Sequence, residues 1–226
     1  NIEKYLNTFF CLFYMGTIIP FPGKPDIKKI TGLDEIMVYI QPMVYYNRAE
    51  GYNSCFTGFD PLEMWFGDIK KGNVSIGRDS KNTISIGRLV NYLVDRDKTI
   101  FSRDITKDDL DSIDCFHGEI YFDDDGRLMY THLAEDHKKT TKLINKCDFG
   151  YRCNKGTRLR TSGENVLVCS PEDAKAPKYS MAELEKDGLV YKVEKLFCPS
   201  IHLGTKGENG DSRIRLDLQY RLLRRI

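Results

Sequence analysis

Apolar and polar residues alternate over several short stretches of this chain, which is the pattern of half-buried β-strands. The cleanest alternation runs over residues 212–223, where apolar side chains fall on one face and mostly charged side chains on the other. The apolar face comprises Ile214, Leu216, Leu218, Tyr220 and Leu222. Similar patterns predict strands within residues 34–46, 62–69, 74–78, 83–88, 142–148, 158–169 and 189–197, and a hairpin across 117–130. Many short strands separated by turn signals predict a mostly β fold, a β-sandwich or barrel.

Polar segments between these strands predict turns and a few short helices. Residues 79–82, Asp-Ser-Lys-Asn, predict a turn between two similar strands. The acidic segment 104–114 predicts a solvated loop or helix, and the charged segment 132–142 predicts a helix. Residues 89–94 fit either the continuation of a strand or a helical turn. Ser180 with Glu183 three residues later is a capping-box pattern, which predicts a short helix over residues 180–186.

The first 33 residues differ from the rest of the chain. Residues 5–21 are apolar on nearly every side, and the Pro-rich segment 20–25 would end a helix there. We therefore expect an N-terminal buried helix and a Pro-rich break over residues 1–33, followed by one β-sandwich domain over residues 34–226. A membrane anchor is the alternative interpretation of the apolar stretch, although it is short for a bilayer span.

Composition narrows the class of partner. The formal net charge of +1 argues against a whole-domain attraction to nucleic acid. Seven cysteines, an odd number with no CxxC pair, favour mostly reduced, buried thiols in an intracellular protein of the nucleus or cytoplasm. The alternative is three disulfides and one free thiol in an oxidising compartment.

Catalytic and metal-binding patterns are poor throughout the sequence. His132 and His137 are five residues apart, so they would not share a helix face as zinc-protease ligands do. Cys115, His117, Cys147 and Cys153 have no common zinc spacing, and nothing near Cys115 marks an activated thiolate. We expect no enzyme activity, no metal and no cofactor.

Basic residues gather around the segment Asn154-Lys155-Gly156-Thr157. The set comprises Arg152, Lys155, Arg158 and Arg160. Arginines that converge with backbone N–H groups and an Asn amide can bind a phosphate or a carboxylate. A solvated basic hairpin is the alternative interpretation.

Five pieces of the sequence, in the right order, resemble the forkhead-associated (FHA) domain. Residues 72–86, GNVSIGRDSKNTISI, resemble the opening strands and IGR motif, and residues 99–103, TIFSR, resemble a turn that follows them. Residues 116–126, FHGEIYFDDDG, resemble the family's histidine-containing hairpin, and residues 148–157, DFGYRCNKGT, its asparagine turn. Residues 210–223 resemble the final strands. The family is a β-sandwich whose loops, at one end, bind phosphothreonine peptides.

The resemblance implies roles for particular residues. Arg78, Ser102, Arg103 and Asn154 would bind the phosphopeptide, and Gly77, His117, Gly156 and Thr157 would shape the loops. Lys155, which is an extra residue in the family's asparagine turn, and Arg158 join the phosphopeptide-binding set as members of the basic group around Asn154. The chain also departs from the family's pattern. If His117 is the true match, Asp114 occupies the place of the phosphate-binding serine. A second alignment places residues 136–141 at the asparagine turn, with no Asn there at all.

These features predict a protein that binds other proteins. The first expectation is a phosphothreonine-peptide docking module or a degenerate FHA-type interaction module with a constitutive partner. The alternative is a structural subunit of a capsid, a membrane-associated assembly or another multi-protein complex. Membrane contact through the N-terminal apolar segment would belong to that alternative.

Overall fold

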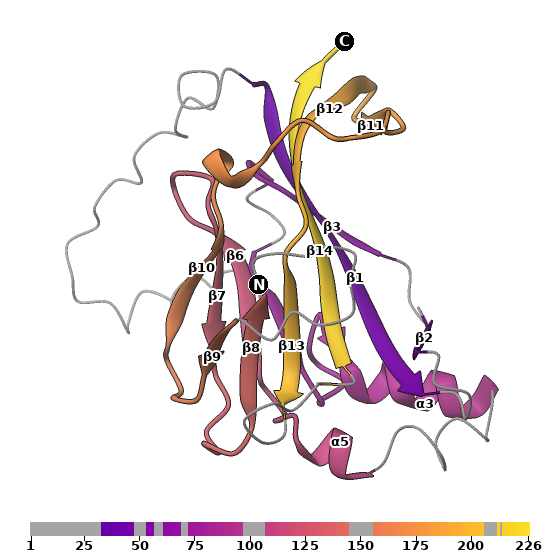
Figure 1. Ribbon diagram of the computed structural model, residues 1–226, viewed down its shortest axis with the longest axis vertical. Helices are drawn as coiled ribbons and strands as arrows, with labels where there is room; N and C mark the ends of the chain where they lie inside the picture. The colour runs from indigo at the N-terminus through magenta and orange to yellow at the C-terminus, as the bar shows by residue number, and fades with distance from the viewer. Residues whose placement is uncertain are drawn as a thin grey trace, which may run out of the picture.

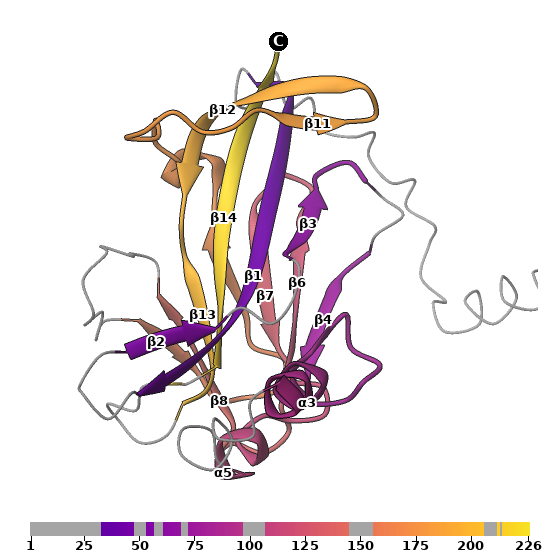
Figure 2. The same cartoon turned by 90° about the vertical axis from the view of Figure 1, so that its right-hand side faces the viewer.

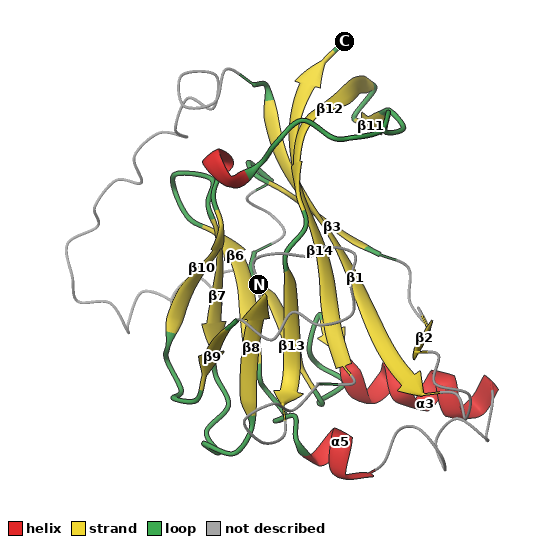
Figure 3. Cartoon of the chain, viewed as in Figure 1, coloured by secondary structure: helices red, strands yellow, loops and turns green. Residues whose placement is uncertain are grey.

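Two β-sheets form most of the protein (Figures 1 and 3). The computed structural model describes residues 33–47, 53–56, 61–68, 72–96, 107–144, 156–205, 212 and 214–226. One sheet has nine strands and the other has five, and the pairing is antiparallel except between β4 and β5. The sequence-based expectation of a mostly β sandwich is therefore confirmed.

The nine-stranded sheet is organised around the ribbon that β1 and β14 form (Figure 2). Ten consecutive residue pairs join these two strands, from Glu35 opposite Leu223 to Val44 opposite Ile214. β12 and β13 then follow one another along the other edge of β14. The nine strands are β1 (Glu35–Asn47), β2 (Asn53–Phe56), β3 (Leu62–Trp65), β8 (Thr140–Ile144), β9 (Thr157–Leu159), β11 (Leu184–Lys186), β12 (Leu189–Phe197), β13 (Ser200–Thr205) and β14 (Ile214–Arg225).

The five-stranded sheet has the order β10-β7-β6-β4-β5. Its strands are β4 (Val74–Gly77), β5 (Ile84–Ser85), β6 (Gly118–Phe122), β7 (Leu128–His132) and β10 (Asn165–Cys169). The predicted hairpin is confirmed, because β6 and β7 pair across the Asp-rich turn, where Asp123 Oδ1 accepts hydrogen bonds from the N–H groups of Asp125 and Arg127.

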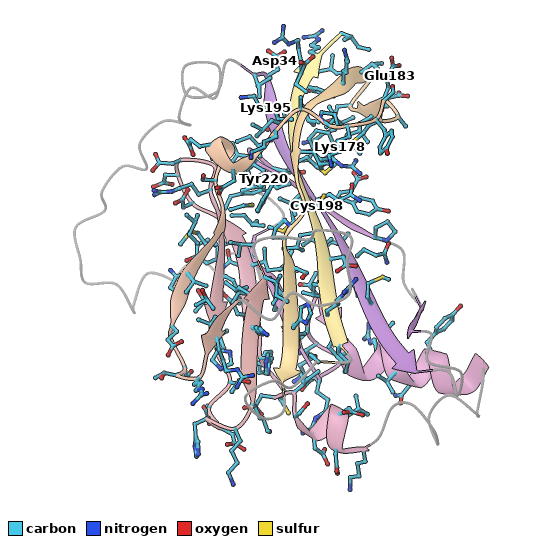
Figure 4. The ribbon with its side chains drawn as sticks, viewed as in Figure 1. Asp34, Lys178, Glu183, Lys195, Cys198 and Tyr220 are labelled. Atoms are coloured by element: carbon cyan, nitrogen blue, oxygen red, sulfur yellow. The ribbon has the colours of Figure 1, made fainter. Side chains whose placement is uncertain are left out.

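Apolar side chains from both sheets pack into one continuous core. The alternation predicted for the last strand is confirmed, because its five apolar residues are each 1% exposed or less. Tyr220 lies in this core (Figure 4), and its hydroxyl donates to the carbonyl of Gly126 in the β6–β7 turn. Near the upper end in Figure 4, the Asp34 carboxylate accepts the N–H of Arg225, 2.9 Å away.

Helices are short, and the two α-helices lie near the same end of the sandwich (Figure 3). They are α3 (Ile86–Arg96) and α5 (Lys107–Asp111), together with the 3-10 turn η2 (Pro171–Asp173). The predicted strand over 83–88 is wrong beyond Ser85, since Ile86 begins α3 and buries its apolar face through Leu89 and Val90. The helix predicted over 132–142 is also wrong, because residues 140–142 belong to β8.

The helix predicted over residues 180–186 is replaced by a β-hairpin. β11 pairs with β12 across a two-residue turn, in which Asp187 and Gly188 have φ angles of 54° and 75°. Such left-handed pairs match the twist of flanking strands, and Asp-Gly is a favoured sequence for them. The hairpin signal therefore dominated over the capping-box signal of Ser180.

The expected N-terminal helix over residues 1–33 lies outside the described residues, except for Leu33. Within the described part of the chain, no helix is both long enough and apolar enough to cross a membrane.

Candidate functional site

The loops at the helical end of the sandwich hold Arg78, the residue that the FHA resemblance identifies as the phosphate-binding arginine. Arg78 follows β4 directly, and Gly77 brings its backbone close to the segment before β6. A Cβ atom at Gly77 would lie 2.1 Å from the carbonyl oxygen of Cys115, so only glycine fits there. Arg78 N–H then donates to Asp114 O at 2.9 Å.

Backbone and side-chain hydrogen bonds join the turn after β4 to the turn before β6. Asn82 is 4% exposed, and its amide donates to Asp79 O at 3.0 Å and to Cys115 O at 2.7 Å. His117 N–H donates to Ile76 O at 2.8 Å. Residues 76–82 and 114–117 therefore form one rigid unit that fixes the origin of the Arg78 side chain.

The guanidinium of Arg78 forms an ion pair with a carboxylate of the acidic segment. Arg78 Nη1 lies 2.7 Å from Asp111 Oδ1 at the end of α5. The two side chains are 36% and 49% exposed, so water screens much of their attraction. The arginine that would grip a phosphate already has an anionic partner from its own chain.

A second carboxylate, that of Asp114, lies among three hydrogen-bond donors. It accepts from Lys139 Nζ at 3.2 Å and from the N–H groups of Glu135 at 3.1 Å and Cys115 at 3.2 Å. Partial burial alone would raise the pKa of Asp114, but the bonds from Lys139 and these N–H groups outweigh it and lower the pKa below 3.8. Asp114 is therefore a stable anion that anchors the 133–139 loop.

A buried polar cluster lies beneath these loops, with the hydroxyl of Thr141 at its centre. Thr141 Oγ1 is 3.1 Å from each of three groups: His117 Nε2, His132 Nδ1 and the Tyr130 hydroxyl. All four side chains are 0% exposed. Asp114 N–H donates to His117 Nδ1, so the neutral ring carries its proton on Nε2 and donates it to Thr141.

Burial keeps both histidines of this cluster neutral. Burial and then the neighbouring His132 lower the pKa of His117 from 6.5 to about 3, although the Asp114 carboxylate opposes the shift. The pKa of His132 is also lowered by burial, against the opposing charges of Glu164 and Asp114. The two rings meet edge to face, with centroids 5.2 Å apart. This cluster is a structural support for the loops above it.

The remaining residues of the predicted site are only partly described. Ser102, Arg103, Asn154 and Lys155 lie outside the described residues. Arg158 lies on β9, at the edge of the nine-stranded sheet, whereas Arg78 directly follows β4 of the five-stranded sheet. Thr157 starts β9, and Gly156 before it approaches β8 so closely that a Cβ atom would lie 2.2 Å from Leu143 O.

The described residues include possible metal ligands and three of the cysteines. Among the described residues, no group of three or more His, Cys, Asp or Glu side chains is placed to hold a metal ion. Cys115, Cys169 and Cys198 are not in disulfide bonds. The expectation of buried cysteines is correct for Cys169, whereas Cys198 is half-buried and Cys115 is exposed.

Sequence reasoning missed Asp111, Lys139, Tyr130 and Thr141. The acidic composition of residues 104–114 was the available signal for Asp111. The second alignment, over residues 136–141, was the signal for Thr141, which is in hydrogen-bonding contact with His117.

Comparison with known proteins gave no match to any family model, to any curated protein or to any solved structure.

Proposed function

We propose that this chain is a degenerate FHA-type module that docks another protein without recognising phosphate. Docking would use the loop end, which we define as residues 78–82, 111–117 and 133–139. These three segments lie at the end of the sandwich where β4 ends and β6 begins, near α3 and α5 (Figure 2).

The placement of the motif residues supports the family part of this proposal. Gly77 ends β4 and Arg78 follows it, His117 precedes β6, and β4 and β6 are neighbours in one sheet. The two turns therefore meet, as a site assembled from both would require. The second alignment gains support from the same geometry, because His117 contacts Thr141, which is the last residue of that aligned segment.

The observation that carries the proposal is the Arg78–Asp111 ion pair. A phosphate dianion needs a free arginine, hydroxyl or N–H donors and a nearby cation. Here Asp111 pairs with Arg78, and Asp114 both occupies the serine's place and pairs with Lys139. A phosphate would meet two carboxylates where it needs donors, and like charge opposes its approach.

One aromatic side chain supports docking to a protein surface. Phe116 is 51% exposed at the tip of the turn before β6, although large apolar side chains are usually buried. Aromatic residues are enriched among those that dominate protein–protein binding energy. Phe116 is held in place by the neighbouring bonds of Cys115 and His117.

The test is a degenerate peptide array that carries each peptide in phosphorylated and unphosphorylated form. We expect bound peptides to be retained equally in both forms, and Phe116→Asp to weaken them at least tenfold. Tyr179→Asp, at an exposed residue outside the loop end, is the matched control and should bind normally. An array with no bound peptide, or binding that requires phosphate, would contradict the proposal.

A second variant tests whether the carboxylates of Asp111 and Asp114 prevent phosphate binding. Asp111→Asn combined with Asp114→Ser removes two negative charges and supplies the hydroxyl that the family's pattern has there. We expect this double variant to gain a preference for phosphothreonine peptides that Arg78→Ala then removes. The unaltered protein could instead bind phosphothreonine peptides already, with Arg78→Ala lowering that affinity by about ten- to a hundredfold. The pocket would then bind phosphate and the module would not be degenerate.

A further inference from the structure

β10 is an outer strand of the five-stranded sheet, and among the described strands only β7 pairs with it (Figure 1). Outer strands are usually kept from pairing with other chains by short length or by charge. β5 has two residues, β9 and β11 have three with charged side chains, and β3 carries Glu63. β10 has five residues, Asn-Val-Leu-Val-Cys, with no charge and no proline.

The register of β10 shows which of its backbone groups face away from β7. His132 N–H donates to Glu164 O, and Val166 lies opposite Tyr130. Because backbone groups alternate in direction along an antiparallel strand, those of Val166 face β7 and those of Asn165 and Leu167 face outward. Two N–H groups and two C=O groups of β10 therefore point outward from the edge of the sheet.

The side chains beside this edge are apolar. Leu167 is 45% exposed and lies opposite Met129, which in turn lies opposite Tyr121 on β6. The Tyr121 hydroxyl accepts a hydrogen bond from the side-chain amide of Asn165 at 2.6 Å. An apolar row therefore runs across three strands and ends at the open edge.

The acidic residues that flank β10 turn back onto their own loops. Glu164 accepts from the N–H groups of Arg160 and Thr161 at 3.3 and 3.2 Å. Asp173 accepts from the N–H and hydroxyl of Ser170 at 2.8 and 3.0 Å. These bonds direct both carboxylates toward their own loops.

We propose that the β10 edge pairs with β10 of a second copy of this chain, antiparallel and centred on Val166. In that register Asn165 of one copy faces Leu167 of the other, and their four outward N–H groups make four backbone hydrogen bonds. Val166 faces its own counterpart, and Glu164 faces Val168, so no charge meets a like charge. The two five-stranded sheets become one continuous sheet.

This self-pairing is limited in length, and that sets its strength. The register of β10 against β7 shifts between Leu167 and Cys169, so the regular edge ends at Leu167. Such a small contact lies below the size of stable interfaces. We therefore expect a reversible dimer with a dissociation constant of about 10 μM to 1 mM.

The first experiment is sedimentation velocity on the full chain across that concentration range. The unaltered protein should shift from monomer to dimer. Leu167→Pro should stay monomeric with an unchanged circular-dichroism spectrum, because it removes only an outward N–H. Leu167→Lys should weaken the dimer at least tenfold, and Tyr179→Lys, the same kind of change at another exposed residue, should not weaken it. A monomer at every concentration, or association that survives both Leu167 variants, overturns the proposal.

The second experiment tests the register. Val166→Cys places one thiol opposite its counterpart, within the range of a disulfide. Diamide should therefore cross-link this variant into covalent dimers well above the level of the unaltered chain. Asn165→Cys, which faces Leu167 of the partner, should cross-link no more than the unaltered chain. The reverse order of the two variants overturns the pairing centred on Val166.

Discussion

The loop end and the ends of β7 and β8 next to it hold two polar groupings that differ in their exposure to water. Arg78 and Asp111 form a charged pair at the surface, where they are 36% and 49% exposed. The second grouping is the neutral, fully buried cluster around Thr141, whose members are each 0% exposed: His117, Tyr130, His132 and Thr141. Both are hydrogen-bonded, yet only the buried one excludes water.

This difference decides what each grouping contributes. An exposed ion pair stabilises a fold by about 0–1 kcal/mol, because water screens it and replaces it when it breaks. A buried group that loses its partner costs about 1–3 kcal/mol, since no water replaces the lost bond. The buried cluster therefore holds the loops in place, while the exposed pair is free to be remodelled by a partner or a substitution.

Thr141→Val should have the largest effect on stability. The change keeps the shape of the side chain but leaves His117 Nε2, His132 Nδ1 and the Tyr130 hydroxyl without their shared partner. We expect the free energy of unfolding to fall by about 2–4 kcal/mol, as measured by urea denaturation. Thr131→Val, on the partly exposed face of β7, is the matched control and should change it by less than about 0.5 kcal/mol. If Thr141→Val and Thr131→Val lower the free energy of unfolding equally, the buried cluster stabilises the fold no more than an exposed polar group does.

Lowering the pH should destabilise the fold through the same buried cluster, without any substitution. Between 6.5 and about 3, the pH range set by the lowered pKa of His117, the unfolded chain binds a proton at this residue that the folded chain does not. Stability is therefore fully present above pH 6.5 and falls as the pH falls through this window, by about 1.4 kcal/mol per pH unit. His132 adds a change in the same direction, because its pKa is lowered too.

This pH dependence can be followed by denaturant unfolding and by the ring resonances of the histidines. Lowering the pH from 6.5 to about 5 should cost about 2 kcal/mol through His117 alone. In the folded protein the His117 ring should show no titration above about pH 5. Titration of His117 near pH 6.5 would mean that water reaches the cluster.

Arg78→Ala should have the smallest effect on stability. Its ion pair with Asp111 is exposed, so we expect the free energy of unfolding to change by less than about 1 kcal/mol in urea denaturation. The melting temperature should also be insensitive to added salt, because little of the stability depends on a screened pair. A loss comparable to that of Thr141→Val would place Arg78 among the structural residues instead.

Local patterns predicted the sheets well and the site less well. The alternation of residues 214–222 is repeated in the burial of β14, because one face of that strand meets the core and the other does not. The Asp-rich turn of the β6–β7 hairpin was equally readable. The second copy of Ser-Ile-Gly-Arg predicts a strand that includes Ile86, yet only the first copy pairs on both sides.

The site depended on contacts between residues that are far apart in the chain. Arg78 meets Asp111 and Asp114 because the turn before β6 bonds to the turn after β4, and no spacing rule links positions 33 or more residues apart. The importance of Thr141 likewise depends on β8 facing β7 across the core. The motif predicts Arg78 as a site residue, whereas nothing in the sequence predicts Asp111 as its partner.

The long ribbon of β1 and β14 also constrains the order of events during synthesis. Glu35 pairs with Leu223, and most of the partners of β1 in the nine-stranded sheet lie on β14. A ribosome must therefore synthesise the chain as far as Leu223 before β1 can complete its pairing, while the five-stranded sheet needs nothing beyond Cys169. Contacts between such distant segments are slow to form. Until β14 emerges, β1 exposes an unpaired apolar edge, so nascent chains stalled before residue 214 should depend on chaperones.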